Sequence, residues 1–95
     1  MVFMQQFLAG SLALVTAFGP LDTVPDFTGK SVKEVETAWK KPVKSIDATG
    51  QNRLVVSPSN WQVCSQEPAA ATEFAPGKKP QLTVKVVKKV GETCP

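Results

Sequence analysis

Apolar residues between positions 31 and 42 recur with the spacing of an α-helix. They form one stripe along the helix, while the lysines and glutamates between them face water. Ser31 is followed three positions later by Glu34, which is the spacing of a capping box. Pro42 disfavours helical geometry at the residue before it. The pattern predicts a helix that begins at Val32 and ends before Pro42. Its apolar stripe consists of Val32, Val35, Ala38 and Trp39.

Strict alternation of apolar and polar positions predicts the strands. The clearest strand covers 82–87, and shorter ones are expected at 43–46, 54–56 and 61–65. In the 61–65 strand, the side chains of Trp61, Val63 and Ser65 should share one face, with Gln62 and Cys64 on the other. The segment 66–81 is rich in Pro, Ala, Gly and Lys, so we expect a long surface connection there.

These elements predict an α+β fold in which one helix packs on a small, three-stranded, mostly antiparallel sheet. A chain of 95 residues has room for one domain only. That domain is small enough for its core alone to give marginal stability, so an additional covalent constraint is expected. We assign the domain to residues 24–95, after an N-terminal segment at 1–17.

The N-terminal segment is uncharged and apolar. Residues 7–15 read FLAGSLALV, which has the length of a signal-peptide core, and the small residues of Val15-Thr16-Ala17 fit a cleavage site. We expect an exported protein, cleaved after Ala17 and secreted or associated with the cell wall. A retained membrane anchor and a buried core helix stay open as alternatives, since no Lys or Arg precedes the apolar run.

Cys64 and Cys94 form an even pair in a small chain with an export signal, which favours one disulfide. Closing a loop of about 30 residues would restrict the unfolded chain by roughly 3 to 4 kcal/mol. Two free or metal-binding thiols are the alternative. The chain has no His and no further Cys to complete a zinc site, so we expect no metal.

The net charge of +3 is unevenly distributed, because five lysines crowd the last quarter of the chain. Such lysines can meet an anionic polymer, or they can guard an exposed strand against unwanted pairing. Nucleic acid is not an expected partner, since the chain has one arginine, no tyrosine and no aromatic residue among these lysines. The five are Lys78, Lys79, Lys85, Lys88 and Lys89.

Catalysis is not expected from this sequence. The commonest general base and metal ligand is absent, because the chain contains no His. The carboxylates are scattered singly, no serine lies in a GxSxG turn, and no glycine-rich phosphate loop is present. We therefore expect a non-enzymatic protein without a cofactor.

Four segments in order resemble the PASTA domain family. Residues 24–39 read VPDFTGKSVKEVETAW, 47–53 read DATGQNR, 60–70 read NWQVCSQEPAA, and 92–95 read ETCP. This set is similar to the disulfide-bearing, single-PASTA secreted proteins of actinobacteria such as mycobacteria and streptomycetes. One departure from the family pattern is Ala71, which stands where a Gly commonly follows the Pro-Ala-Ala run.

The resemblance implies a module that faces the cell wall and binds peptidoglycan, its fragments or another anionic wall polymer. The alternative is a spacer or interaction module that docks on another envelope protein, or on a membrane complex if the N-terminal segment is retained. In the wall-binding role, Trp61 is an exposed or half-exposed platform for sugar or peptide. The alternative, which the residue type favours, is that Trp61 is a core residue like Trp39. The alternative role of Gln66 is to hold a turn by bonding the backbone. The alternative role of Arg53 is to pair with Asp47. The candidate ligand contacts are Arg53, Trp61, Gln66, Glu67, Lys78 and Lys79.

Overall fold

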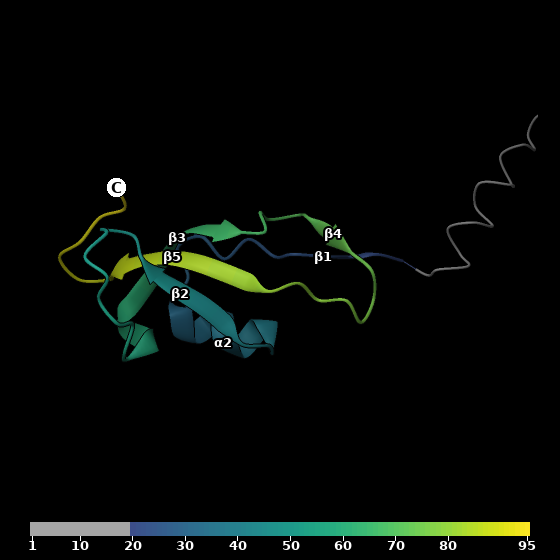
Figure 1. Cartoon of the computed structure of the whole chain (residues 1–95), viewed down its shortest axis with the longest axis horizontal. Helices are drawn as coiled ribbons and strands as arrows, with labels where there is room; N and C mark the ends of the chain where they lie inside the picture. Colours follow the sequence, from purple (N-terminus) through teal and green to yellow (C-terminus); the bar gives the residue numbers. More distant parts are fainter. Residues whose placement is uncertain (1–19) are drawn as a thin grey trace, which may run out of the picture.

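The computed structural model describes residues 20–95 (Figure 1). The predicted signal or anchor segment, 1–17, lies outside the described residues. Two short strands, one α-helix, one 3-10 helix and three longer strands follow one another. In chain order these are β1 (Asp22–Thr23), α2 (Val32–Trp39), β2 (Val43–Asp47), η2 (Pro58–Asn60), β3 (Trp61–Glu67), β4 (Glu73–Phe74) and β5 (Leu82–Lys88).

The capping box at the start of α2 is confirmed. The Ser31 hydroxyl accepts the Glu34 amide at 3.1 Å, and the Glu34 carboxylate accepts the Ser31 amide at 2.8 Å. The helix ends at Trp39, because Lys40 adopts a left-handed conformation with φ of 58°. Ala38, predicted to lie in the buried stripe, is exposed. It lies about 100° around the helix from Trp39, at the edge of a stripe that is narrower than expected.

The three longer strands form one sheet in the order β2-β5-β3. β5 lies in the centre, parallel to β2 and antiparallel to β3. A separate two-stranded sheet pairs β1 with β4, also antiparallel. The prediction of one helix with a mostly antiparallel sheet is thus confirmed for the described residues. The parallel pairing was not predicted: β2 and β5 run in the same direction because the chain between them includes β3, which runs the opposite way.

The strand predicted at 54–56 is absent. Val55 packs against the core while its two neighbours point outward, so the alternation is real. The segment has no strand partner, and left-handed residues at Asn52 (φ of 57°) and Ser57 (φ of 58°) turn the chain on either side of it. The result is a short extended segment in which Val55 faces the core, whereas Leu54 and Val56 face solvent.

A β-bulge between Val63 and Ser65 corrects the predicted faces of β3. Ser65 lies opposite the outward-facing Lys85, whereas Val63 lies opposite the buried Val86. Ser65 therefore points away from the Trp61 face, contrary to prediction. The extra residue of a bulge moves all later side chains of the strand to the opposite face. Gln66 is thereby turned toward the helix side of the sheet.

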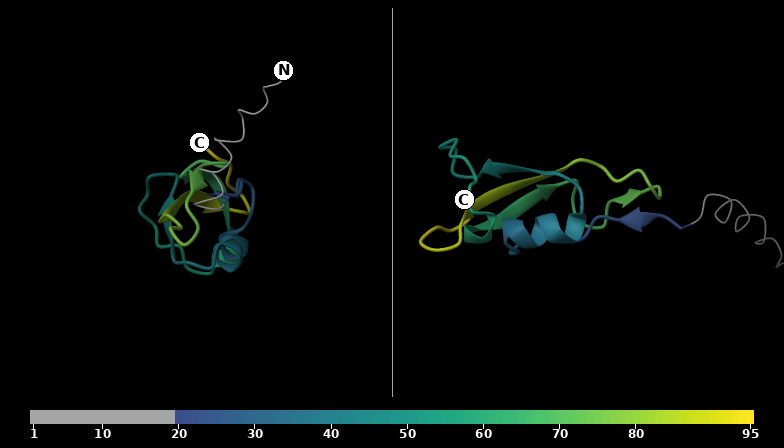
Figure 2. Two further views of the ribbon diagram at one scale, coloured as in Figure 1. Left: turned by 90° about the vertical axis from the view of Figure 1, so that its right-hand side faces the viewer. Right: turned by 90° about the horizontal axis from the view of Figure 1, so that it is seen from below.

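α2 lies against one face of the β2-β5-β3 sheet (Figure 2), and the core residues pack between them. The ring of Trp39 meets Phe27 and Phe74 edge to face, with centroids 6.3 and 5.9 Å apart. This aromatic contact extends the core from the helix to the small β1-β4 sheet. The buried apolar residues are Val24, Phe27, Val32, Val35, Trp39, Trp61, Val63, Leu82, Val84, Val86 and Val87.

The disulfide between Cys64 and Cys94 is confirmed, with a Cα–Cα distance of 5.6 Å. It joins β3 to the C-terminal tail across a sequence separation of 30 residues. The tail is thereby held against β3 at Cys64, and the loop closure restricts the unfolded chain.

Breaking this bond should strongly destabilise the domain. We expect Cys94→Ser to lower the free energy of unfolding by about 2 to 5 kcal/mol, and the melting temperature by about 10 °C or more. Cys64→Ser is the matched control and should give the same loss, because both variants remove one bond. A melting temperature unchanged from that of the wild type under oxidising conditions would contradict a structural role for the bond.

Ala71 adopts a left-handed conformation with φ of 70°, at the position where the PASTA pattern has Gly. An L-residue is strained there by about 1 to 2 kcal/mol, and Gly is not. We expect Ala71→Gly to raise the free energy of unfolding by about 0.5 to 1 kcal/mol in urea denaturation. The neighbouring change Ala70→Gly is the control and should lower it. A destabilised Ala71→Gly variant would contradict the strain.

Candidate functional site

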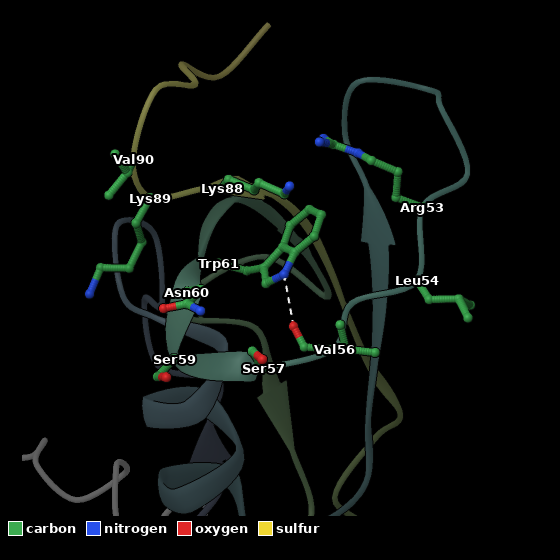
Figure 3. A pocket seen from close by; sticks show the side chains of 10 residues that line it. All are labelled: Arg53, Leu54, Val56, Ser57, Ser59, Asn60, Trp61, Lys88, Lys89 and Val90. Carbon is green, nitrogen blue, oxygen red and sulfur yellow. Dashed lines mark hydrogen bonds between the residues drawn. The ribbon is translucent and has the colours of Figure 1, made fainter.

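A hollow of about 630 Å³ lies between the segment before η2 and the end of β5 (Figure 3). The end of β5 lies at the end of the domain away from β1 (Figure 1). We call this hollow the Trp61 pocket. One wall comes from the segment between β2 and η2, and the other from the end of β5 and the turn that follows. The lining residues are Arg53, Leu54, Val56, Ser57, Ser59, Asn60, Trp61, Lys88, Lys89 and Val90.

Trp61 forms the floor of the pocket and is only 3% exposed. Its indole Nε1–H donates to the carbonyl of Val56 at 3.0 Å. The guanidinium of Arg53 lies 5.0 Å from the ring centroid, and the ammonium of Lys88 lies 5.9 Å from it. The prediction of an exposed or half-exposed platform is therefore wrong, and the alternative of a core residue is confirmed. The first residue of β3 faces the helix layer and is covered by its neighbours.

Arg53 links two carboxylates at one side of the pocket. Its Nε donates to Asp47 Oδ2 at 2.7 Å and its Nη2 to Asp47 Oδ1 at 3.1 Å. Nη1 and Nη2 donate to the two carboxylate oxygens of Glu92 at 2.8 and 3.1 Å. We call these three residues the Arg53 bridge. The alternative role of Arg53, pairing with Asp47, is confirmed, whereas Glu92 was not predicted as a second partner.

The bridge fixes the ionisation of its members. The guanidinium of Arg53 holds the pKa of Asp47 well below its usual value, with a further contribution from hydrogen bonds of Thr49; the burial of this carboxylate opposes both effects. Arg53 also lowers the pKa of Glu92, as does the Lys88 amide. The two carboxylates in turn raise the pKa of Arg53. All three groups are therefore charged at neutral pH, and together they carry a net charge of about −1.

The positive charge that the pocket offers a ligand thus comes from Lys88 and Lys89. Both are exposed, and neither forms a salt bridge among residues 20–95. No acidic residue lines the pocket. An anionic group entering it meets two ammonium groups whose charge no carboxylate within salt-bridge distance compensates.

The upper walls of the pocket are aliphatic and strongly exposed. Leu54 is 82% exposed, Val56 67% and Val90 89%. Two of these residues follow Arg53 and the third follows Lys89, so they flank the pocket from both sides (Figure 3). A group of exposed aliphatic side chains around a hollow is typical of a binding surface.

The other predicted contacts lie elsewhere. Gln66 accepts the Phe27 amide at 2.7 Å and donates to the Pro25 carbonyl at 2.8 Å, so its alternative role of holding the backbone is confirmed. Glu67 lines a hollow of about 440 Å³ on the sheet. Of the predicted contacts, the structure thus brings only Arg53 and Trp61 together in the Trp61 pocket.

The predicted lysines of the 75–81 connection are also far from the Trp61 pocket in the fold. Lys79 lies 4.7 Å from the ring centroid of Trp39 and donates to the Trp39 carbonyl. It therefore holds the connection against the end of α2. Lys78 is exposed and does not line the Trp61 pocket.

Sequence reasoning missed most of the pocket. Lys88 and Lys89 were recognised as part of a basic cluster but not as contacts, and the three aliphatic residues were not singled out. The exposure of Leu54 and Val56 could have been inferred from the sequence. These apolar residues alternate with Val55 in a segment that is too short to pair with a strand on each side. Val90 lies in a turn, where an apolar residue gives no comparable signal.

The pocket combines ammonium groups, aliphatic walls and hydroxyl or amide donors, which is the chemistry of binding. Among residues 20–95 no three His, Cys, Asp or Glu side chains are grouped so as to hold a metal ion. None of the helices in this part of the chain has the length and apolar character needed to cross a membrane.

No protein-family model, curated protein or solved structure matches this chain. The resemblance to PASTA domains therefore stays a prediction from the sequence motifs. The pocket has to be interpreted from its own residues.

The lowered pKa of Asp47 makes stability depend on pH. A depressed pKa in the folded state adds stability above the unfolded value, near 3.8, and this contribution is lost as pH falls toward the folded pKa. We expect the urea midpoint to fall between pH 5 and pH 2, and to fall less in Asp47→Asn. Asp22→Asn, an exposed carboxylate at the other end of the domain, is the control. Equal acid sensitivity of the wild type and Asp47→Asn would contradict this assignment.

Proposed function

We propose that this chain is an extracytoplasmic, non-enzymatic, PASTA-like module that binds cell-wall peptidoglycan or its fragments in the Trp61 pocket. The observation that carries the proposal is the lining of the pocket, where Lys88 and Lys89 adjoin aliphatic walls with no carboxylate among the lining residues. The order of motifs in the sequence supplies the class of module.

The lining favours the peptide part of peptidoglycan over its sugars. Stacking on a sugar needs an open aromatic face, and Trp61 is buried with its indole N–H already bonded. Stem peptides carry carboxylates and small methyl side chains. Carboxylates suit the two lysines, and methyl groups suit the walls formed by Leu54, Val56 and Val90.

The position outside the cytoplasm is supported by the disulfide, since such bonds persist in oxidising compartments. The apolar segment 1–17, which has the pattern of a signal peptide, also supports export. A binding role without catalysis is supported by the absence of His from the chain.

The two pocket lysines should dominate the affinity for anionic fragments. We expect the double variant Lys88→Gln/Lys89→Gln to weaken binding of soluble muropeptides by about threefold to tenfold in NMR titration. Lys33→Gln, an exposed lysine on α2, is the matched control and should bind as the wild type does. Retention on purified peptidoglycan should likewise fall at high salt, because exposed charges are screened.

Failure of the wild type to bind muropeptides or purified peptidoglycan at any salt concentration would contradict the proposed function. Equal affinities of the wild type and the double lysine variant would instead exclude the Trp61 pocket as the site.

A second candidate function is docking on another envelope protein. The observation that favours it is the strong exposure of Leu54, Val56 and Val90, which is costly to leave in water. Peptidoglycan stripped of protein separates the two functions: it retains a wall-binding module and does not retain one that recognises only a protein.

A further inference from the structure

The Trp61 pocket has two walls that come from distant parts of the chain. The first wall, Leu54 to Val56, begins directly after Arg53. The second wall, Lys88 to Val90, ends two residues before Glu92. The second wall is bonded to β3 through Lys88 and to the Asn60 carbonyl through the Lys89 amide, whereas the first wall is part of no ladder. Among residues 20–95, no backbone hydrogen bond joins the two walls to each other.

The Arg53 bridge joins these two walls. Arg53 and Glu92 are 39 positions apart in sequence and meet through two parallel hydrogen bonds. Glu92 Oε1 also accepts the Lys88 amide at 2.8 Å, which ties the turn back to the start of the second wall. A guanidinium and a carboxylate that meet in this two-fold way fix orientation as well as distance.

The other half of the bridge anchors the first wall to the sheet. Asp47, the last residue of β2, is buried and accepts both the side chain and the backbone amide of Arg53. The same carboxylate accepts the amide and hydroxyl of Thr49 at 3.0 and 2.7 Å. The first wall therefore starts from a point fixed on β2, and its far end is held by the bond from Trp61 to Val56.

Arg53 is poorly placed to attract a ligand itself. Its Nε and both Nη atoms already donate to two carboxylates, and its charge is more than balanced by them. An incoming anion would have to compete with Asp47 and Glu92 at 2.7 to 3.1 Å. The attraction of anions is left to Lys88 and Lys89.

We propose that Arg53 is a positioning residue that holds the two walls of the Trp61 pocket at a fixed separation, so that the site is formed before a ligand arrives. The effect of this role on ligand binding rests on the proposed function. Ordering a wall only when the ligand binds would cost affinity, and a preformed pocket avoids that cost.

The test is Glu92→Gln, which breaks the ionic link to Arg53 and leaves all residues that line the pocket in place. We expect the Trp61 indole N–H to exchange with solvent several times faster in NMR, because the first wall loses its anchor to the second. Muropeptide affinity should fall by about threefold to tenfold. Arg53→Lys, which keeps the charge but loses the planar fork, should behave in the same way.

Two controls and one conservative variant separate positioning from general stability. Glu67→Gln removes a carboxylate outside the pocket and should change neither indole exchange nor affinity. The amides of Val84 and Val86 in the central strand report on global opening, and we expect their exchange in Glu92→Gln to stay at the wild-type rate. Glu92→Asp retains the charge and should restore part of the lost affinity.

Equal indole exchange in the wild type and Glu92→Gln would overturn the positioning role, as would exchange that accelerates only in step with the core amides. If the wild type binds muropeptides, an equal affinity of Glu92→Gln would also overturn the positioning role. A wild type that binds no muropeptide overturns the proposed function instead, and the indole exchange then decides the role of Arg53 on its own.

Discussion

The end of the domain that carries the pocket depends on one interaction, the pairing of Arg53 with Asp47 on one side and Glu92 on the other. Arg53 is the only arginine in the sequence. A lysine could neutralise one carboxylate, but only the planar guanidinium meets two carboxylates with paired hydrogen bonds. Through it the end of β2, the extended segment 52–57 and the tail after β5 become one unit. The pocket is the space that this unit leaves above Trp61.

The disulfide and the bridge share the work of closing a small domain. Cys94 lies two residues after Glu92, so the tail is fixed covalently to β3 and electrostatically to β2 at nearly the same point. The sheet contributes a further constraint. The bulge in β3 turns the side chain of Gln66 toward the backbone of the Pro25–Phe27 segment. The side chain of Gln66 thereby holds the backbone of residues 25–27 against the sheet through two hydrogen bonds.

Features coded by neighbouring residues were predictable from the sequence, and most features that depend on distant partners were not. The start of α2 follows from Ser31 and Glu34, which are three positions apart. The disulfide is a distant contact that could be predicted, because Cys64 and Cys94 are the only two cysteines in the sequence. The burial of Trp61, the lack of a partner for 54–56 and the capture of Glu92 by Arg53 all require the folded arrangement. The bulge shows the same limit, since one extra residue reverses the faces that alternation predicts.

The arrangement of the pocket requires that the Arg53 guanidinium be immobilised between two carboxylates. Because the chain has one arginine, a single Arg Nε–H resonance can be followed by NMR without ambiguity. We expect a resonance that is visible at neutral pH, protected from solvent exchange and correlated through space with protons of Trp61. An Nε–H signal lost to rapid exchange at neutral pH, with no such correlation, would contradict it.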